Sequence, residues 1–254
     1  MKIKTELLQI SIGNNSCDIF ISKPDDSQKH PAVLMYMDAF GPRESLYDLA
    51  KTLSENGYFV LVPNLFFRQL KAPFFDFKTP LQGEDLAKTR ELVIPLAKNF
   101  DAKQGLEDAG HYLNFLKNRS DVSQQPIAIT GYCMGGRMAL QTAAKYPEDI
   151  CAIAGFHSAG LATNAENSPH LLLPQVKAEI YYGHADQDAS LPPEQIQRFQ
   201  QALQKTSLRY ETEIYTGAPH GFMMRDLPAF NSKAFDRHWQ KLLPLLQRTL
   251  HPSA

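Results

Sequence analysis

Short runs of apolar residues alternate along the chain with stretches in which the apolar positions repeat every three or four residues. The first pattern predicts strands buried on both faces of a sheet, and the second predicts amphipathic helices. Predicted strands cover residues 32–37, 58–62, 126–130, 151–155, 179–182 and 208–215. Predicted helices cover residues 45–56, 101–118, 135–145, 192–205 and 230–250. This alternation predicts an α/β fold in which helices cover both faces of a mostly parallel sheet.

The first twenty residues follow a different pattern. Residues 3–12 are strand-like, Gly13, Asn14 and Asn15 form a turn signal, and residues 17–21 fit an antiparallel partner strand. No internal repeat and no linker-like stretch divides the 254 residues, and this length suits one large α/β domain. We therefore expect a single domain over residues 1–254.

Composition narrows the class of protein. Lys and Arg number 26 and Asp and Glu 27, so the formal net charge of −1 gives no reason to expect nucleic acid or an anionic membrane as a partner. The longest apolar runs are shorter than the roughly 18 residues of a membrane span, and the N-terminal sequence lacks a secretory signal pattern. Three cysteines are too few for a disulfide framework. We expect a cytoplasmic enzyme, with a monomer as the default and a dimer as the alternative.

The sequence Gly131-Tyr132-Cys133-Met134-Gly135-Gly136 lies directly between a predicted strand and a predicted helix. This is the context of a nucleophile elbow, in which a tight turn exposes one side chain at the carboxyl edge of the sheet. The flanking positions need glycine because neighbouring backbone leaves no room for a side chain. Cys133 is therefore the candidate nucleophile. The other interpretation, a glycine-rich turn of a nucleotide-binding fold, would require the G-x-G-x-x-G pattern, which is absent from the turn.

A nucleophile requires a base and a group that orients the base, and in this architecture they follow in the order acid, then histidine. Asp186 follows the predicted strand 179–182 closely and is the favoured acid, with Asp188 as the alternative. His220 follows the predicted strand 208–215 and is the best placed of eight histidines. The oxyanion that forms when the nucleophile attacks a carbonyl needs two hydrogen-bond donors. The expected donors are the backbone N–H of Met134 and that of Ala39, which follows the predicted strand 32–37.

With these parts in place, the sequence resembles the dienelactone hydrolase family of the α/β-hydrolase superfamily. The resemblance covers residues from about 31 to 246. Besides the elbow with Cys in place of Ser, three sequence segments carry the resemblance: Asp38-Ala39-Phe40-Gly41, Val62-Pro63-Asn64-Leu65-Phe66-Phe67-Arg68-Gln69 and Pro219-His220-Gly221-Phe222.

The resemblance implies an α/β-hydrolase fold and hydrolysis of a lactone or similar enol ester through Cys133, Asp186 and His220, with neither a metal nor an organic cofactor. Asp38 stands where the type member has a glutamate that holds the resting thiol in check. The type member binds the carboxylate of its substrate with two arginines, and Arg90 stands at the position of one of them. Met224 stands at the other position.

Residues beside these motifs are further candidates for substrate contact. They are Tyr132 next to the nucleophile, His157 after the predicted strand 151–155, and Phe222 near the histidine. The stretch 66–98 is a candidate lid or rim over the pocket. Two alternatives to a lactonase remain, a broader carboxylesterase or thioesterase on the same triad and a non-catalytic relative that binds a small molecule.

Overall fold

Eight strands hydrogen-bond into one sheet in the order β1-β2-β4-β3-β5-β6-β7-β8. The structure is a computed structural model that describes residues 1–75 and 80–251. The strands are β1 (Ile3–Ile12), β2 (Asn15–Pro24), β3 (Ala32–Tyr36), β4 (Phe59–Pro63), β5 (Ile127–Tyr132), β6 (Ile150–Phe156), β7 (Glu179–Gln187) and β8 (Tyr210–Pro219). The strands from β3 to β8 are parallel to one another, whereas β1 and β2 form the expected antiparallel hairpin at one edge.

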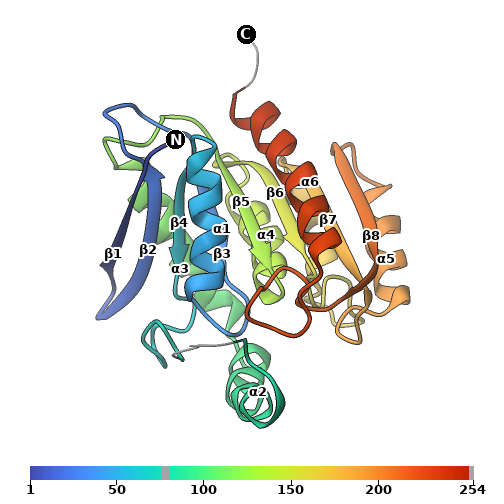
Figure 1. Cartoon of the computed structure of the whole chain (residues 1–254). Helices are drawn as coiled ribbons and strands as arrows, with labels where there is room; N and C mark the ends of the chain where they lie inside the picture. The colour runs from blue at the N-terminus through green and yellow to red at the C-terminus, as the bar shows by residue number, and fades with distance from the viewer. Residues whose placement is uncertain (76–79, 252–254) are drawn as a thin grey trace.

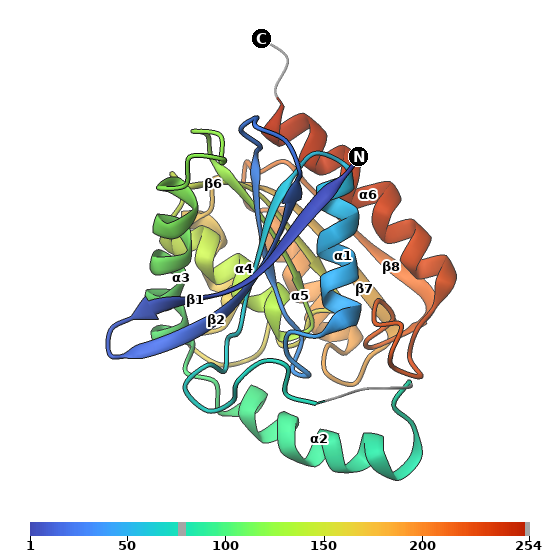
Figure 2. The same ribbon diagram turned by 60° about the vertical axis from the view of Figure 1, so that its left-hand side comes forward.

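Helices cover both faces of the sheet, as the periodicity predicts. They are α1 (Glu44–Glu55), α2 (Gly83–Lys98), α3 (Ala102–Lys117), α4 (Met134–Lys145), α5 (Pro193–Leu203) and α6 (Ser232–Leu250), with a 3-10 helix at Pro169–Gln175. Figures 1 and 2 show α1 and α6 on one face and α3, α4 and α5 on the other. Helix α2 lies apart from both layers, beyond one end of the sheet. The α/β-hydrolase architecture expected from the sequence is confirmed.

The central strands are buried over their whole length because helices cover them on both sides. β3 and β4 expose none of their residues, and the apolar runs that predicted them are part of one continuous core. Within the described ranges, no helix is both long enough and apolar enough to cross a membrane.

The structure differs from the predicted elements mainly in β7 and β8. The apolar run predicts a strand that ends at residue 182, but β7 continues to Gln187. The extension is held by parallel pairing with β8, whose partners run from Ile180 opposite Tyr210 to Gln187 opposite Pro219. Cross-strand hydrogen bonds therefore carry the strand through polar residues that a hydrophobic pattern cannot assign. This extension moves the loop that follows β7.

The carboxyl ends of the parallel strands meet at one edge of the sheet, where binding sites of open α/β folds lie. Cys133 follows β5, His157 follows β6, Asp188 follows β7 and His220 follows β8. Asp38 lies two residues beyond the end of β3. The topology thus brings together every chain segment in which the sequence places candidate chemistry.

Candidate active site

The backbone of Cys133 has φ 55° and ψ −119°, a conformation that L-residues rarely adopt. It is the residue at which β5 turns into α4. A side chain at Gly131 would place its Cβ 2.2 Å from the Gly135 carbonyl oxygen, and one at Gly135 would lie 2.6 Å from the Met37 carbonyl oxygen. Both positions therefore require glycine, and the tight turn predicted from the sequence is present.

The Cys133 side chain contacts the predicted histidine. His220 Nε2 lies 3.1 Å from Cys133 Sγ, and His220 Nδ1 lies 2.6 Å from Asp188 Oδ2. The Asp188 carboxylate is itself held in place, because it accepts hydrogen bonds from the backbone N–H of Ser190 at 2.8 Å and from the Ser190 hydroxyl at 2.5 Å. The sulfur, the imidazole and the carboxylate form one line of contacts.

The sequence favours Asp186 as the acid, but in the structure Asp188, and not Asp186, contacts His220. Asp186 is exposed and its Oδ2 accepts a hydrogen bond from the backbone N–H of Gly217 at 2.8 Å. The reason is the extension of β7, which still includes residue 186, so that the first carboxylate beyond the strand is Asp188. The Asp188 side chain is almost fully buried beneath the imidazole.

Two opposing effects set the protonation of this pair. Burial alone would lower the pKa of His220, but the adjacent Cys133 sulfur and the Asp188 carboxylate outweigh it and raise the pKa to about 10. Burial would likewise raise the pKa of Asp188, yet the hydrogen bonds from His220 and Ser190 lower it below the usual value. An ionised carboxylate thus faces an imidazole that keeps its proton at neutral pH.

The two expected oxyanion donors line the same cavity. Met134 is the first residue of α4, and the N–H groups of the first helical turn have no partner within the helix. Ala39 lies in the turn after β3, beside the cavity. Both residues are buried, so their backbone groups have little competition from bulk water.

Asp38 does not have the role that the resemblance implies. Its carboxylate accepts hydrogen bonds from Arg43 Nη1 at 2.7 Å, from Arg43 Nη2 at 3.0 Å and from the Phe40 N–H at 2.9 Å. Among the described residues, its side-chain hydrogen bonds do not include one to the Cys133 sulfur. Arg43 also binds Asp226, because its Nε donates a hydrogen bond to Asp226 Oδ2 at 2.6 Å. Asp38 therefore fixes the turn that carries Ala39.

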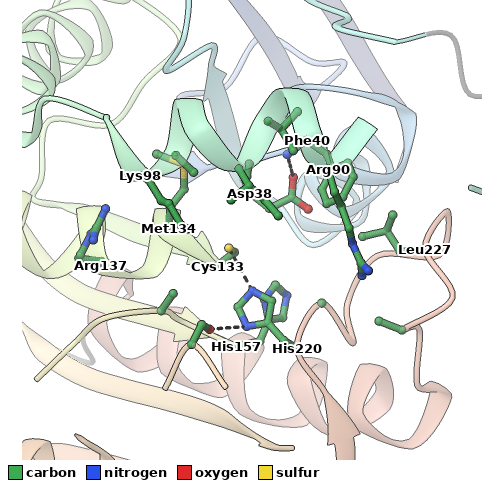
Figure 3. Close-up of a pocket in the computed structure, with 18 residues that line it drawn as sticks. Asp38, Phe40, Arg90, Lys98, Cys133, Met134, Arg137, His157, His220 and Leu227 are labelled. Atoms are coloured by element: carbon green, nitrogen blue, oxygen red, sulfur yellow. Dashed lines mark hydrogen bonds between the residues drawn. The ribbon is translucent and has the colours of Figure 1, made fainter. Parts of the chain in front are cut away.

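A cavity of about 370 Å³ opens over Cys133. Figure 3 shows Cys133 and His220 at its floor and Arg90 on another wall. Helix α2 supplies Arg90, Ile94 and Lys98 to this wall, so part of the candidate stretch 66–98 does border the pocket. Residues 76–79 of that stretch lie outside the described residues.

The other three candidate contact residues occupy different environments. His157 lines the cavity but is fully buried, and its ring meets the His220 ring edge-on with 5.2 Å between centroids. Tyr132 is fully buried and points towards α6, where its hydroxyl lies 3.0 Å from His238 Nε2. Phe222 is fully buried between His157 and Tyr215. Unlike His157, Tyr132 and Phe222 are not among the residues that line the cavity, so the structure does not bring these two predicted contact residues to it.

Sequence reasoning missed two residues of the site. Ser190 holds Asp188, and the Asp-x-Ser spacing in Asp188-Ala189-Ser190 is the signal that could have found it. Arg137 lines the cavity one helical turn beyond Cys133, and its four-residue spacing on α4 places it on the same helical face.

Comparisons with known proteins identify relatives of the whole chain. The model of the dienelactone hydrolase family matches residues 17–250. A protein of Yersinia pestis named "Putative carboxymethylenebutenolidase" is 28% identical over 233 residues, which cover 88% of this chain and 80% of that protein. A protein of the same name from Synechocystis sp. is 24% identical over 251 residues and covers 98% of both chains.

Among solved structures, that of a "Putative Dienelactone Hydrolase" from Klebsiella pneumoniae superposes with a TM-score of 0.83 at 21% identity. The match covers 98% of this chain and 100% of the other, and it shows a common fold. Because the family model spans nearly the whole chain, the chain belongs to the dienelactone hydrolase family and is a hydrolase of that type.

Proposed function

We propose that this hydrolase cleaves lactones or similarly activated esters through a Cys133–His220–Asp188 triad and a covalent acyl-enzyme. The observation that carries the proposal is the unbroken line of contacts from the Cys133 sulfur through both ring nitrogens of His220 to the Asp188 carboxylate. A nucleophile, a base and a group that orients the base are the parts that acyl transfer requires.

The imidazole prepares the nucleophile. A cation beside a cysteine, at a helix N-terminus, favours the thiolate, which is the reactive form of the residue. His220 supplies that cation, because its pKa is raised to about 10. Asp188 holds Nδ1, which leaves Nε2 directed at the sulfur. A protonated imidazole therefore lies beside the Cys133 sulfur before the substrate binds.

Attack by the Cys133 sulfur on the substrate carbonyl forms a carbon–sulfur bond and moves the carbonyl electrons onto oxygen. The backbone N–H groups of Met134 and Ala39 stabilise this oxyanion. When the intermediate collapses, the carbon–oxygen bond to the leaving group breaks and the His220 Nε2–H proton passes to the departing oxygen. In a lactone this step opens the ring, and the departing oxygen stays in the same molecule, at the far end of the acyl chain that is bonded to the sulfur.

Acylation also lets His220 act as a base in the second half of the reaction. Once the sulfur is in a thioester it carries no charge, so the interaction with Cys133 that raises the pKa of His220 is lost. The neutral imidazole can then take a proton from water, and the resulting hydroxide equivalent attacks the thioester carbonyl. The carbon–sulfur bond breaks, the acid product leaves, and the thiolate and imidazolium are restored.

The nucleophile favours substrates with good leaving groups. A thiolate is itself a good leaving group, so the intermediate returns to reactants unless the alcohol side departs readily. Enol lactones and activated esters meet this condition, whereas amides do not. The cavity of about 370 Å³ accommodates a small molecule rather than a polymer.

The test compares wild-type protein with Cys133→Ala and with Cys151→Ser on an enol lactone, a saturated γ-lactone, 4-nitrophenyl acetate and an acyl thioester. We expect Cys133→Ala to lose at least about 10³-fold in kcat/KM on every substrate that the wild type hydrolyses. Cys151→Ser is the matched control, because Cys151 lies in β6 and burial raises its pKa to about 11.

Iodoacetamide at neutral pH provides a second readout on the same proteins. It should label Cys133 selectively, because burial also raises the pKa of Cys17, to about 12. Full activity in Cys133→Ala would contradict the triad. Turnover of the thioester and nitrophenyl ester without turnover of either lactone would retain the triad and replace the lactone assignment by a broader esterase.

A further inference from the structure

Arg137 occupies a distinct position in the cavity. It belongs to α4, four residues after Cys133, and lines the cavity together with Cys133 and Met134. Figure 3 shows Arg137 on one side of the Cys133 sulfur and His220 on the other. Its side chain is half-buried, and the Cys133 sulfur is the charged group that acts on its guanidinium.

Arg137 has no anionic partner among the residues that the structure describes. Within those ranges no carboxylate lies at ion-pair distance from it. The arginines outside the cavity wall behave differently, since each contacts a carboxylate, a backbone carbonyl or an aromatic ring. They are Arg43, Arg68, Arg119, Arg198, Arg209, Arg225, Arg237 and Arg248.

An unpaired, partly dehydrated guanidinium is unfavourable unless something compensates it. Burial lowers the pKa of Arg137, and the Cys133 sulfur is the group that opposes this effect. In the acyl-enzyme the Cys133 sulfur is part of a neutral thioester, and no carboxylate of residues 1–75 and 80–251 lies at ion-pair distance from Arg137. An anionic group on the substrate would supply the missing partner through charge-assisted hydrogen bonds.

The charges around the cavity point in the same direction. Apart from the Cys133–His220 pair, three cationic side chains line it, Arg90, Lys98 and Arg137, against one carboxylate, Asp38. That carboxylate is already occupied by Arg43. The cavity therefore presents an excess of positive charge to whatever enters it.

The resemblance to the family places a second substrate-binding arginine where this chain has Met224, which is fully buried. The neighbouring Arg225 does not replace it, because its guanidinium stacks on Phe235 at 4.5 Å.

We propose that Arg137 determines specificity by binding an anionic group, such as a carboxylate, on the acyl part of the substrate. The leaving group must lie near His220 Nε2 to receive its proton, so a group across the sulfur from His220 belongs to the acyl part. This inference rests on the proposed acyl-transfer function. It makes Arg137 a binding residue, with a role distinct from that of the exposed Arg90 on α2.

The test uses two esters that differ in one terminal group, 4-nitrophenyl valerate and the mono-4-nitrophenyl ester of glutaric acid, each corrected for uncatalysed hydrolysis. We expect Arg137→Met to lower the ratio of kcat/KM for the glutarate ester to that for the valerate about 10-fold to 100-fold. Arg137→Lys should lower it less, because a charge remains but the planar fork is lost. Arg209→Met, which removes an exposed arginine far from the cavity, should leave the ratio within about twofold.

The outcomes separate this inference from the function on which it rests. If the wild type hydrolyses neither these two esters nor any substrate of the panel described above, the proposed acyl transfer fails. If it hydrolyses both and Arg137→Met leaves the ratio unchanged, or slows both esters equally, the anion site fails and Arg137 acts on the thiolate alone. A wild-type measurement covers the case of a misfolded variant: glutarate should slow iodoacetamide labelling of Cys133, whereas uncharged glutaramide should not.

Discussion

Two walls of the cavity are built in different ways. The sheet-edge wall consists of Cys133, His157 and His220, which follow parallel strands and are fixed by packing from both helical layers. The α2 wall consists of residues of one helix, of which Arg90, Ile94 and Lys98 are exposed, Ala97 is half-buried and Val93 is buried. Helix α2 buries two of its residues, Thr89 and Val93, whereas α4 buries nearly all of its own.

This difference separates chemistry from recognition. Reacting groups must hold their positions within a fraction of an ångström, and only a densely packed sheet edge provides this. Side chains on a loosely packed helix can be exchanged without disturbing the core. We infer that substitutions in the sheet-edge wall change rate or stability, while substitutions in the α2 wall change the choice of substrate.

The largest effect is expected at Asp188. Asp188→Asn removes the carboxylate that orients His220 and should lower kcat about 10³-fold to 10⁴-fold. Asp186→Asn is the matched control, because Asp186 contacts the Gly217 N–H and should change kcat by less than about threefold. Steady-state kinetics on one ester would check both, and equal losses in the two variants would contradict the assignment of the acid.

The next effect concerns stability. In Gly135→Ala the new Cβ would lie 2.6 Å from the Met37 carbonyl oxygen and 2.7 Å from that of Tyr36, so backbone must move. We expect this to reduce the free energy of unfolding by about 2–3 kcal/mol. Leu92→Ala removes an exposed side chain of α2 and should change it by less than about 0.5 kcal/mol. Urea denaturation of both variants would measure the contrast, and comparable losses would show that α2 is as constrained as the sheet edge.

A smaller effect appears in the dependence of thiol reactivity on pH. A free cysteine with a pKa of about 8.5 gains more than about tenfold in alkylation rate between pH 6 and 8. His220 keeps its proton up to about pH 10, because its pKa is raised, so a cation lies beside the Cys133 sulfur throughout this interval and favours its reactive form. We expect the rate at Cys133 to rise less than about threefold over that interval.

Asp188→Asn sharpens this measurement. Removing a carboxylate that raises the pKa of His220 lowers that pKa, so the imidazolium should lose its proton at a lower pH than in the wild type. The pH-independent region of alkylation should therefore end earlier. A wild-type rate that follows the ordinary cysteine curve would show that Cys133 and His220 do not form an ion pair.

The smallest effect is expected at His157, whose two ring nitrogens are buried without a hydrogen-bond partner among the described residues. Burial, together with the charge of His220, lowers the pKa of His157 well below its usual value, so the ring is neutral. His157→Phe keeps an aromatic ring and removes both unsatisfied atoms, which should raise the free energy of unfolding by about 1 kcal/mol. His184→Phe is the matched control outside the cavity, because His184 is equally buried and its ring nitrogens also have no hydrogen-bond partner in the part of the chain that the structure describes. A loss of stability confined to His157→Phe would indicate a hidden polar partner at that ring.

The sequence predicts the parts of the site that depend on short motifs. Cys133 follows from its flanking glycines, and His220 from its place after the last predicted strand. Both are features of local backbone geometry, which a few adjacent residues determine. The α/β architecture follows in the same way from the alternation of apolar runs and helical periodicity.

The remaining parts depend on contacts between distant segments. Asp188 replaces Asp186 because pairing with β8 extends β7 by several polar residues. Tyr132 lies beside the nucleophile in sequence, yet successive strand residues point to opposite faces, so its ring packs towards α6. Asp38 binds Arg43, a residue whose orientation depends on Asp226 far along the chain. Neither hydrophobic pattern nor spacing contains this information.

The buried chain of Asp38, Arg43 and Asp226 has a consequence for exchanging parts between relatives. It joins the turn that carries the oxyanion donor Ala39 to the segment just after His220, although 188 positions separate the two carboxylates. A chimera that took one of these loops from another family member would leave Arg43 with an unmatched neighbour in the interior. In directed recombination, the two loops should therefore be inherited together, as a single unit that is discontinuous in the gene.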